Sequence, residues 1–97
     1  MQTPLDLADV IAARIDGELD LATAPYVAEY LRQVVNRGSR VVLDMSAVTF
    51  MDCAGLSELV QAHRRAEHGG GWVHLTGVSA GPLRVLRLAR NCDLLVV

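Results

Sequence analysis

The stretch Val41–Leu59, VVLDMSAVTFMDCAGLSEL, passes from a continuous apolar run into a helical pattern. The apolar run belongs to Arg40–Met45 (RVVLDM), and a run of this kind predicts a strand that is buried on both faces. The pattern that follows predicts a helix from Cys53 to Glu67. Its apolar stripe, at i, i+3, i+4 and i+7, consists of Leu56, Leu59, Val60 and His63.

The chain on either side repeats this alternation. Short apolar runs predict three more strands, at Val10–Ile15, Trp72–Leu75 and Leu94–Val97. The first is closed by the turn signal Asp16-Gly17, and Leu5–Leu7 is a candidate partner strand for it.

Two further helices are predicted. The first is capped by Thr23, tolerates Pro25 in its first turn and ends before Asn36 and Gly38; the second runs over Pro82–Arg90. Its apolar residues are Leu83, Leu86 and Leu88. Alternating strands and helices joined by short loops predict an α/β fold, with a small, mainly parallel sheet and about three helices packed on it.

Composition limits the function classes. The 97 residues fit one domain, and no apolar run approaches the roughly 20 residues of a membrane-spanning helix, so no membrane insertion is expected. The start, MQTPLDLADV, lacks a basic region followed by an apolar core, which predicts a cytoplasmic location. A net charge of -2 with scattered arginines disfavours direct nucleic-acid binding. Arg64-Arg65 and the group Arg84, Arg87 and Arg90 are interpreted as solvated sides of two helices.

The residues offer little catalytic or metal chemistry. No glycine-rich phosphate loop is present, and the three histidines lack metal-ligand spacing, so neither a metal nor a cofactor is expected. His63 lies on the apolar stripe of its helix and is predicted to be a hydrogen-bonded core or boundary residue. A thiol at a helix start, such as Cys53, can act as a nucleophile, but the adjacent Asp52 disfavours the thiolate. We therefore favour Cys53 as a small packing residue and expect no enzyme.

The two cysteines are predicted to lie at opposite edges of the sheet. Cys53 follows a strand at its carboxyl end, whereas Cys92 precedes the last strand. A strand of about five residues spans roughly 17 Å, whereas bridged Cα atoms lie about 4.4–6.8 Å apart. An intramolecular disulfide is therefore not expected.

The start of the Cys53–Glu67 helix is the best candidate for a functional site. Asp44 is expected at the end of a buried strand and Asp52 in a capping position, beside the free backbone N–H groups of Ala54–Ser57. The carboxyl edge of a parallel sheet is where α/β folds place ligands. The pattern indicates a binding surface, although capping alone accounts equally well for the two aspartates.

Three motifs in order resemble the STAS domain, in particular the bacterial anti-sigma-factor antagonists. They are Ile15–Pro25 (IDGELDLATAP), the stretch Val41–Leu59 quoted above, and Gly81–Ala89 (GPLRVLRLA), and the resemblance runs from about Val10 to Val97. It implies a single STAS domain over residues 1–97 that binds an anti-sigma factor, a kinase-like ATPase, and so releases a sigma factor to direct transcription. The partner-binding positions implied are Asp20, Asp44, Asp52, Cys53, Ala54, Gly55 and Ser57.

The chain departs from the family pattern at the phosphorylation switch. The family's acceptor is generally the second Ser or Thr of an Asp-Ser-Ser-Gly turn, where a phosphate changes the charge of the docking surface. Here Cys53 and Ala54 occupy the two positions, so the acceptor position carries no hydroxyl. Thr49 and Ser57 are nearby hydroxyls, but both are better interpreted as capping or solvated. The chain is expected to bind permanently or to be controlled otherwise, for example through oxidation of Cys53.

A second departure is at the end of the chain. Family members commonly continue into a final helix, which is expected to be absent here because the sequence ends at Val97. The sheet face left uncovered would then form an apolar patch, covered by another protein or by a second copy in a homodimer.

Two rival functions remain open. The first is a STAS-type accessory subunit of a membrane transport complex, such as a lipid-transporting ABC system, whose ATPase would dock at the same corner. The second is a thiol-dependent enzyme that uses Cys53.

Overall fold

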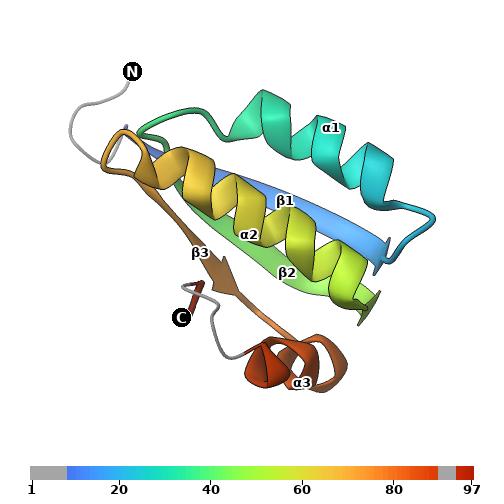
Figure 1. The fold of residues 1–97 in the computed structure, drawn as a ribbon. Coiled ribbons are helices and arrows are strands. Elements are labelled where there is room, and N and C mark those ends of the chain that lie inside the picture. Colours follow the sequence, from blue (N-terminus) through green and yellow to red (C-terminus); the bar gives the residue numbers. More distant parts are fainter. Residues whose placement is uncertain (1–8, 90–93) are drawn as a thin grey trace.

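The computed structural model describes residues 9–89 and 94–97, which form a parallel sheet with helices packed along it (Figure 1). The elements in chain order are β1 (Val10–Leu19), α1 (Ala24–Val34), β2 (Arg40–Met51), α2 (Cys53–Glu67), β3 (Trp72–Thr76), α3 (Ala80–Leu88) and β4 (Leu95–Val96). All neighbouring strands pair in parallel, in the order β1-β2-β3-β4. The predicted small α/β fold with a mainly parallel sheet is confirmed.

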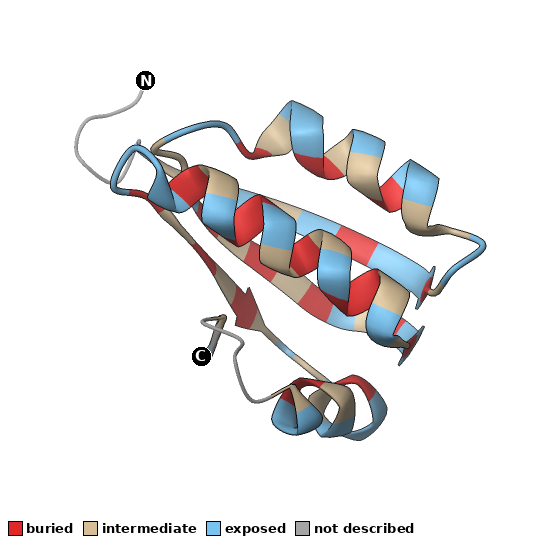
Figure 2. Cartoon of the chain, in the orientation of Figure 1, coloured by how far each residue is buried: buried red, intermediate tan, exposed pale blue. Residues whose placement is uncertain are grey.

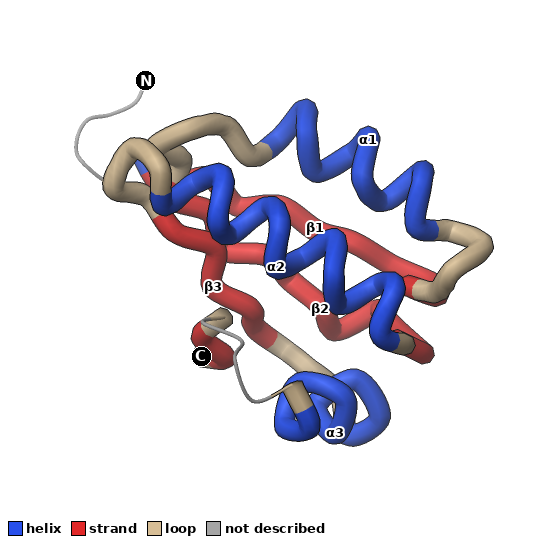
Figure 3. The backbone as a smooth tube through the Cα atoms, in the orientation of Figure 1, coloured by secondary structure: helices blue, strands red, loops and turns tan. Residues whose placement is uncertain are grey.

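The strand order determines on which side of the sheet the helices lie. Each connection steps to the next strand in the same direction, and right-handed crossovers then place successive helices on the same side of the sheet. Figures 1 and 3 show α1 and α2 side by side on one face. The third helix, α3, lies beyond the end of β3 and packs against β2. The start of α2 is therefore flanked by α3 and by the end of β1.

Two predicted strands are longer than expected. β1 continues past Asp16-Gly17 to Leu19, and β2 continues past Met45 to Met51. Asp16-Gly17 forms an irregularity within β1 and does not end the strand, because the register of β1 against β2 shifts on both sides of these two residues. Gly17, with a φ of 83°, supplies the left-handed backbone that such a bulge requires. These extensions carry both strands to the corner where α2 begins.

The remaining boundaries agree more closely. α2 has the predicted bounds, Cys53–Glu67, and α1 ends at Val34. The last helix spans Ala80–Leu88, and the last strand is only the pair Leu95–Val96. The predicted strand Leu5–Leu7 and the position of Cys92 lie outside the described residues.

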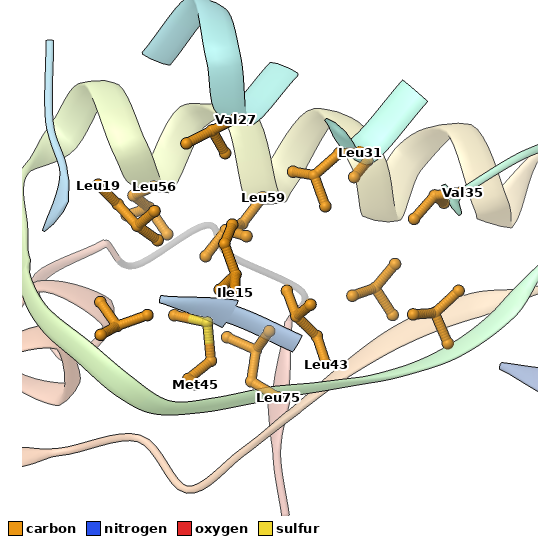
Figure 4. Close-up of a cluster of buried hydrophobic side chains, with 14 of the residues drawn as sticks. Ile15, Leu19, Val27, Leu31, Val35, Leu43, Met45, Leu56, Leu59 and Leu75 are labelled. Carbon is orange, nitrogen blue, oxygen red and sulfur yellow. The ribbon is translucent and has the colours of Figure 1, made fainter. Parts of the chain in front are cut away.

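The hydrophobic core lies between the sheet and its helices. Figure 4 shows side chains from β1, β2 and β3 meeting those of α1 and α2. The fully buried members include Leu19, Leu31, Leu43, Met45, Leu59 and Leu75. Burial of these apolar surfaces, at roughly 25 cal/mol per Å², is the main force that holds the helices to the sheet.

Burial along β2 alternates (Figure 2). Val41, Leu43 and Met45 are buried, whereas Val42 and Asp44 are only half-buried. The prediction of a strand buried on both faces was therefore wrong for the described residues: α1 and α2 cover one face only. On the opposite face, the Trp72 ring stacks on the His74 ring with centroids 3.8 Å apart.

The predicted role of His63 is confirmed. Its side chain is buried in the core face of α2. Its Nδ1 atom accepts a hydrogen bond of 3.0 Å from the Val73 N–H, and its Nε2 atom lies 3.3 Å from a carboxylate oxygen of Glu67. His63 therefore connects α2 to β3 and satisfies a backbone donor that would otherwise be buried and unpaired.

No helix among residues 9–89 and 94–97 combines the length and the apolar character that crossing a membrane requires.

Candidate functional site

The first turn of α2 is held in place by Asp52. Asp52 is the N-cap residue, and its Oδ1 atom accepts hydrogen bonds from the Ala54 N–H at 2.9 Å and from the Gly55 N–H at 3.0 Å. Two of the free amide groups at the helix start are thereby satisfied. The predicted capping position of Asp52 is confirmed.

Asp52 also connects this turn to the loop after β1. Its backbone N–H donates to the Leu19 carbonyl at 3.0 Å, and its Oδ2 atom accepts from the Leu21 N–H at 3.3 Å. One side chain therefore links two loops that are 31 residues apart in the sequence. The corner is a defined structure rather than two independent loops.

Gly55 has a packing role that the sequence did not reveal. A Cβ atom at this position would lie 2.2 Å from the Leu19 carbonyl oxygen, far closer than any van der Waals contact allows. Only glycine permits α2 to start this close to the end of β1. Gly55 was predicted to be a partner-binding position. The structure shows that this position needs a glycine for packing, because a side chain would collide with Leu19.

Asp20 is brought to the corner by its own loop. Its Oδ1 atom accepts from the Thr23 N–H at 2.9 Å, and its N–H donates to Thr23 Oγ1 at 2.9 Å. The Thr23 hydroxyl donates to the Glu18 carbonyl at 2.7 Å. Thr23 is the N-cap residue of α1 by position, but its side chain makes no capping hydrogen bond, so its predicted capping role was wrong. The hydroxyl instead fixes the loop that presents Asp20.

The other predicted positions differ in accessibility. Cys53 is exposed and is a free thiol, Ala54 is half-buried, and Ser57 is exposed. The Ser57 hydroxyl accepts a hydrogen bond of 3.1 Å from the Gln61 side chain. Thr49 Oγ1 donates to the Gly17 carbonyl at 3.4 Å. Both residues are exposed; the Ser57 hydrogen bond lies within α2, whereas the Thr49 hydrogen bond joins β2 to β1.

Asp44 does not belong to this corner. It lies within β2, on the sheet face opposite α2, and not at the end of a strand as predicted. At about 3.3 Å per residue, roughly 20 to 25 Å of strand separates it from Asp52. The Ser46 backbone N–H donates to its Oδ1 atom at 2.9 Å. Hydrogen bonds from the backbone and side chain of Ser46 lower the pKa of Asp44, and the charge of Arg14 contributes less.

An apolar pocket of about 290 Å³ opens beside the first turn of α2. It is lined by Met51, Asp52, Cys53, Leu56, Val85, Leu88 and Ala89. Leu88, on α3, is 76% exposed. From the sequence, Leu88 was predicted to be one of the apolar residues of its helix. It follows Leu86 by two positions, or about 200° around a helix, and this spacing signals that the two cannot share a face.

The ends of β1 and β2 and the start of α2 carry acidic side chains, while the arginines near this corner, Arg84 and Arg87, belong to α3. Asp16 and Glu18 are exposed, and Asp20 and Asp52 are half-buried. No arginine occurs between Ile15 and Leu31 or between Val41 and His63. Large apolar side chains are exposed in the same segments, namely Leu21, Tyr26 and Phe50. A hydrogen bond from Leu21 to Asp52 and the shared pocket bring acidic and apolar residues together in what we call the docking corner: Asp20, Leu21, Asp52, Cys53 and Leu88.

Metal binding finds no support in the described part of the chain, where no group of three or more His, Cys, Asp or Glu side chains is arranged to hold an ion.

Comparison with known proteins gives a consistent picture. The family model described as the STAS domain matches residues 6–96. The anti-sigma-B factor antagonist of Bacillus subtilis (strain 168) is 26% identical over 85 residues, which cover 88% of this chain and 78% of that protein.

Three solved structures share the fold. A putative anti-sigma factor antagonist from Thermotoga maritima has a TM-score of 0.75 and 21% identity, over 91% of this chain and 78% of that one. The unphosphorylated anti-sigma factor antagonist SpoIIAA has a TM-score of 0.65 and 17% identity, over 92% and 79%. A sulfate transporter family protein from Wolinella succinogenes has a TM-score of 0.67 and 24% identity, over 91% and 70%. At these identities the similarity concerns the fold alone.

Proposed function

This chain belongs to the STAS domain family, and we propose that it is an anti-sigma-factor antagonist that acts by binding and without catalysis. In this proposal it captures an anti-sigma factor through the docking corner and so releases a sigma factor. The Bacillus subtilis relative, an anti-sigma-B factor antagonist, supports the choice within the family. The observation that carries it is the corner itself, where Asp52 joins the loop of Asp20 to the exposed first turn of α2. As a regulator of transcription the protein would act in the cytoplasm.

The chemistry of the docking corner describes the partner's surface. Carboxylates at Asp20 and Asp52 favour a basic patch on the partner, since complementary charge accelerates association and fixes the register of a complex. The pocket beside Cys53, about 290 Å³ in volume, fits one apolar side chain inserted between α2 and α3. Apolar anchors in pockets with a polar rim are the usual source of affinity in such interfaces.

Regulation would differ from the phosphorylation switch that the family resemblance implies. Ala54 follows Cys53 in the first turn of α2 and has no hydroxyl to accept a phosphate. A kinase-type anti-sigma factor could therefore bind this chain without inactivating it. The proposed complex persists in the presence of ATP.

The alternative function is an accessory subunit of a membrane transport complex, such as a lipid-transporting ABC system. The fold similarity to a sulfate transporter family protein supports this second candidate. The docking corner would then bind the transporter's ATPase.

The test is calorimetry of the purified protein with each anti-sigma kinase of the same genome, with and without ATP. We expect the wild type to bind one kinase under both conditions. Ala54→Ser restores an acceptor hydroxyl and is expected to lose binding only when ATP is present, while Ala54→Val, which adds bulk without a hydroxyl, reports on the steric effect. Binding to no kinase, together with binding to a transporter ATPase, would reject the antagonist function.

A further inference from the structure

A second pocket lies at the other end of α2. It has a volume of about 500 Å³ and is lined by Arg37, Gln61, Arg64, Arg65 and His68. At 1.5 Å per residue, Arg64 and Arg65 lie about 18 to 20 Å along α2 from Asp52. It is therefore distinct from the docking corner.

The cationic side chains come from two segments. Gln61, Arg64, Arg65 and His68 are spaced i, i+3, i+4 and i+7 and line one face of α2 and its C-cap. Arg37 comes from the loop between α1 and β2. The pocket thus draws its positive charge from two parts of the chain that are distant in sequence.

Backbone contacts fix these two segments against each other. The Gly38 N–H donates to the Ala66 carbonyl at 2.9 Å, and the Trp72 N–H donates to the Ser39 carbonyl at 2.8 Å. A Cβ atom on Gly71 would lie 2.0 Å from the Ser39 carbonyl oxygen, so the loops touch through their backbones. Arg65 adds a side-chain connection, since its Nε–H donates to the Val35 carbonyl at 2.8 Å. The frame that carries the arginines is therefore held by several independent contacts.

The positive charge of the pocket is not neutralised within the described part of the chain. There the ion pairs within 4 Å are Arg32 with Glu29 and His63 with Glu67, and none involves an arginine of the pocket. Glu67 follows Arg64 by three positions on α2, but its carboxylate lies 3.3 Å from His63 Nε2 and pairs with no arginine within 4 Å. Among residues 9–89 and 94–97, no carboxylate therefore lies within 4 Å of the three pocket arginines.

Helix dipoles explain only part of this charge. The carboxyl ends of α1 and α2 both lie at this edge of the sheet, and each is equivalent to about half a negative charge. Two such ends offset about one of the three positive charges of Arg37, Arg64 and Arg65. A net positive charge therefore remains on this frame.

We propose that this pocket binds a phosphate-bearing anion. Guanidinium groups offer paired donors that match the oxygens of a phosphate, and three arginines in one pocket suit a diphosphate or a phosphomonoester. The anion is either a soluble phosphate compound, such as a nucleotide, or a phospholipid headgroup. This inference revises the sequence-based interpretation of Arg64-Arg65 as a solvated helix side, because the structure adds Arg37 to them. It is independent of the proposed partner at the docking corner.

The first experiment is a titration of the ¹⁵N-labelled full chain with pyrophosphate at low ionic strength, followed by amide NMR spectra. We expect saturable shift changes at Arg37, Gly38 and the last two turns of α2. The amides of Asp52–Ser57 are expected to remain unchanged.

Matched variants then locate the site. Arg37→Ala combined with Arg64→Ala removes two exposed side chains and is expected to weaken pyrophosphate binding at least about tenfold. Arg87→Ala removes an exposed arginine on α3, outside the pocket, and is expected to leave binding unchanged. Arg65 is retained because its hydrogen bond to Val35 supports the fold. The single variant Arg64→Gln replaces the pair if the double variant unfolds.

Sedimentation with vesicles separates the two sources of phosphate. Binding to phosphatidic acid vesicles but not to phosphatidylcholine vesicles, lost in the Arg37→Ala/Arg64→Ala variant, would assign the pocket to a lipid headgroup. Pyrophosphate binding with the same dependence, without vesicle binding, would assign it to a soluble anion. Binding of neither probe, or equal weakening by Arg87→Ala, would overturn the proposal.

Discussion

The α carbon of Gly55 lies so close to the Leu19 carbonyl oxygen that a Cβ atom on Gly55 would be 2.2 Å from it. This contact joins the first turn of α2 to the end of β1. Beside it, the Asp52 N–H donates to the same carbonyl at 3.0 Å. The geometry of the docking corner therefore depends on a residue that lacks a side chain and on the aspartate three positions before it.

Gly55→Ala is expected to destabilise the fold. The added methyl group meets backbone atoms, which cannot move aside as a flexible side chain does, so we expect a loss of at least about 2 kcal/mol in the free energy of unfolding. Urea unfolding followed by circular dichroism measures it. Gly81→Ala is the control, because a Cβ atom there meets nothing within 4 Å and α3 gains helix propensity. A stable Gly55→Ala protein would contradict the proposed close contact.

Substitutions at Asp52 separate the capping role from the charge of this residue. Asp52→Ala removes the acceptor for the Ala54, Gly55 and Leu21 amides and is expected to cost about 1 to 2 kcal/mol of stability. Asp52→Asn keeps a capping oxygen and removes the charge, so it is expected to remain close to the wild type in stability. If the carboxylate faces a basic partner, Asp52→Asn weakens binding in calorimetry. Unchanged affinity for the partner would limit Asp52 to capping.

Leu88 tests the pocket at the docking corner. Its side chain is 76% exposed, so Leu88→Ser is expected to change the free energy of unfolding by no more than about 0.5 kcal/mol. Affinity for the partner is expected to fall about tenfold, or about 1.4 kcal/mol. The control is Arg84→Ser, an exposed position on the same helix that does not line the pocket. Equal effects of the two substitutions would remove the pocket from the interface.

The pH dependence of stability should report Asp44. Its pKa is lowered in the folded protein by hydrogen bonds from Ser46, so the ionised form stabilises the fold. This contribution is present above the unfolded-state pKa, about 3.9, and is lost as the pH falls through the lower folded-state pKa. Asp44→Asn is therefore expected to be less stable than the wild type near neutral pH, with the difference shrinking in acid. A difference that does not depend on pH would contradict this role.

Much of the fold was accessible from the sequence. The helical repeat after Cys53 predicted the bounds of α2, and the position of Asp52 before it predicted the cap. His63 on the apolar stripe was correctly predicted to be a hydrogen-bonded core or boundary residue, and it is buried. These signals are local, because helix periodicity and capping depend on residues a few positions apart.

Other features depended on contacts between distant segments. Asp16-Gly17 has the composition of a turn, but pairing with β2 turned it into a bulge within β1. Asp44 precedes the corner in sequence, yet the pleat of β2 directs it to the opposite face of the sheet. No local signal distinguishes these outcomes, since the register of a strand is set by its neighbours.

By itself, the sequence determined the alternation of strands and helices, the start of α2 at Cys53 and the absence of a hydroxyl at Ala54. Only the tertiary structure decided that Asp20 and Asp52 share one corner. It also decided that Leu88 and Cys53 line one pocket, and that Arg37 lines a second pocket with Arg64 and Arg65. The physical reason is that propensity, periodicity and capping act within a few residues. Packing and parallel pairing instead bring together groups that are about 30 residues apart, as in the hydrogen bond from the Leu21 backbone N–H to the Asp52 carboxylate.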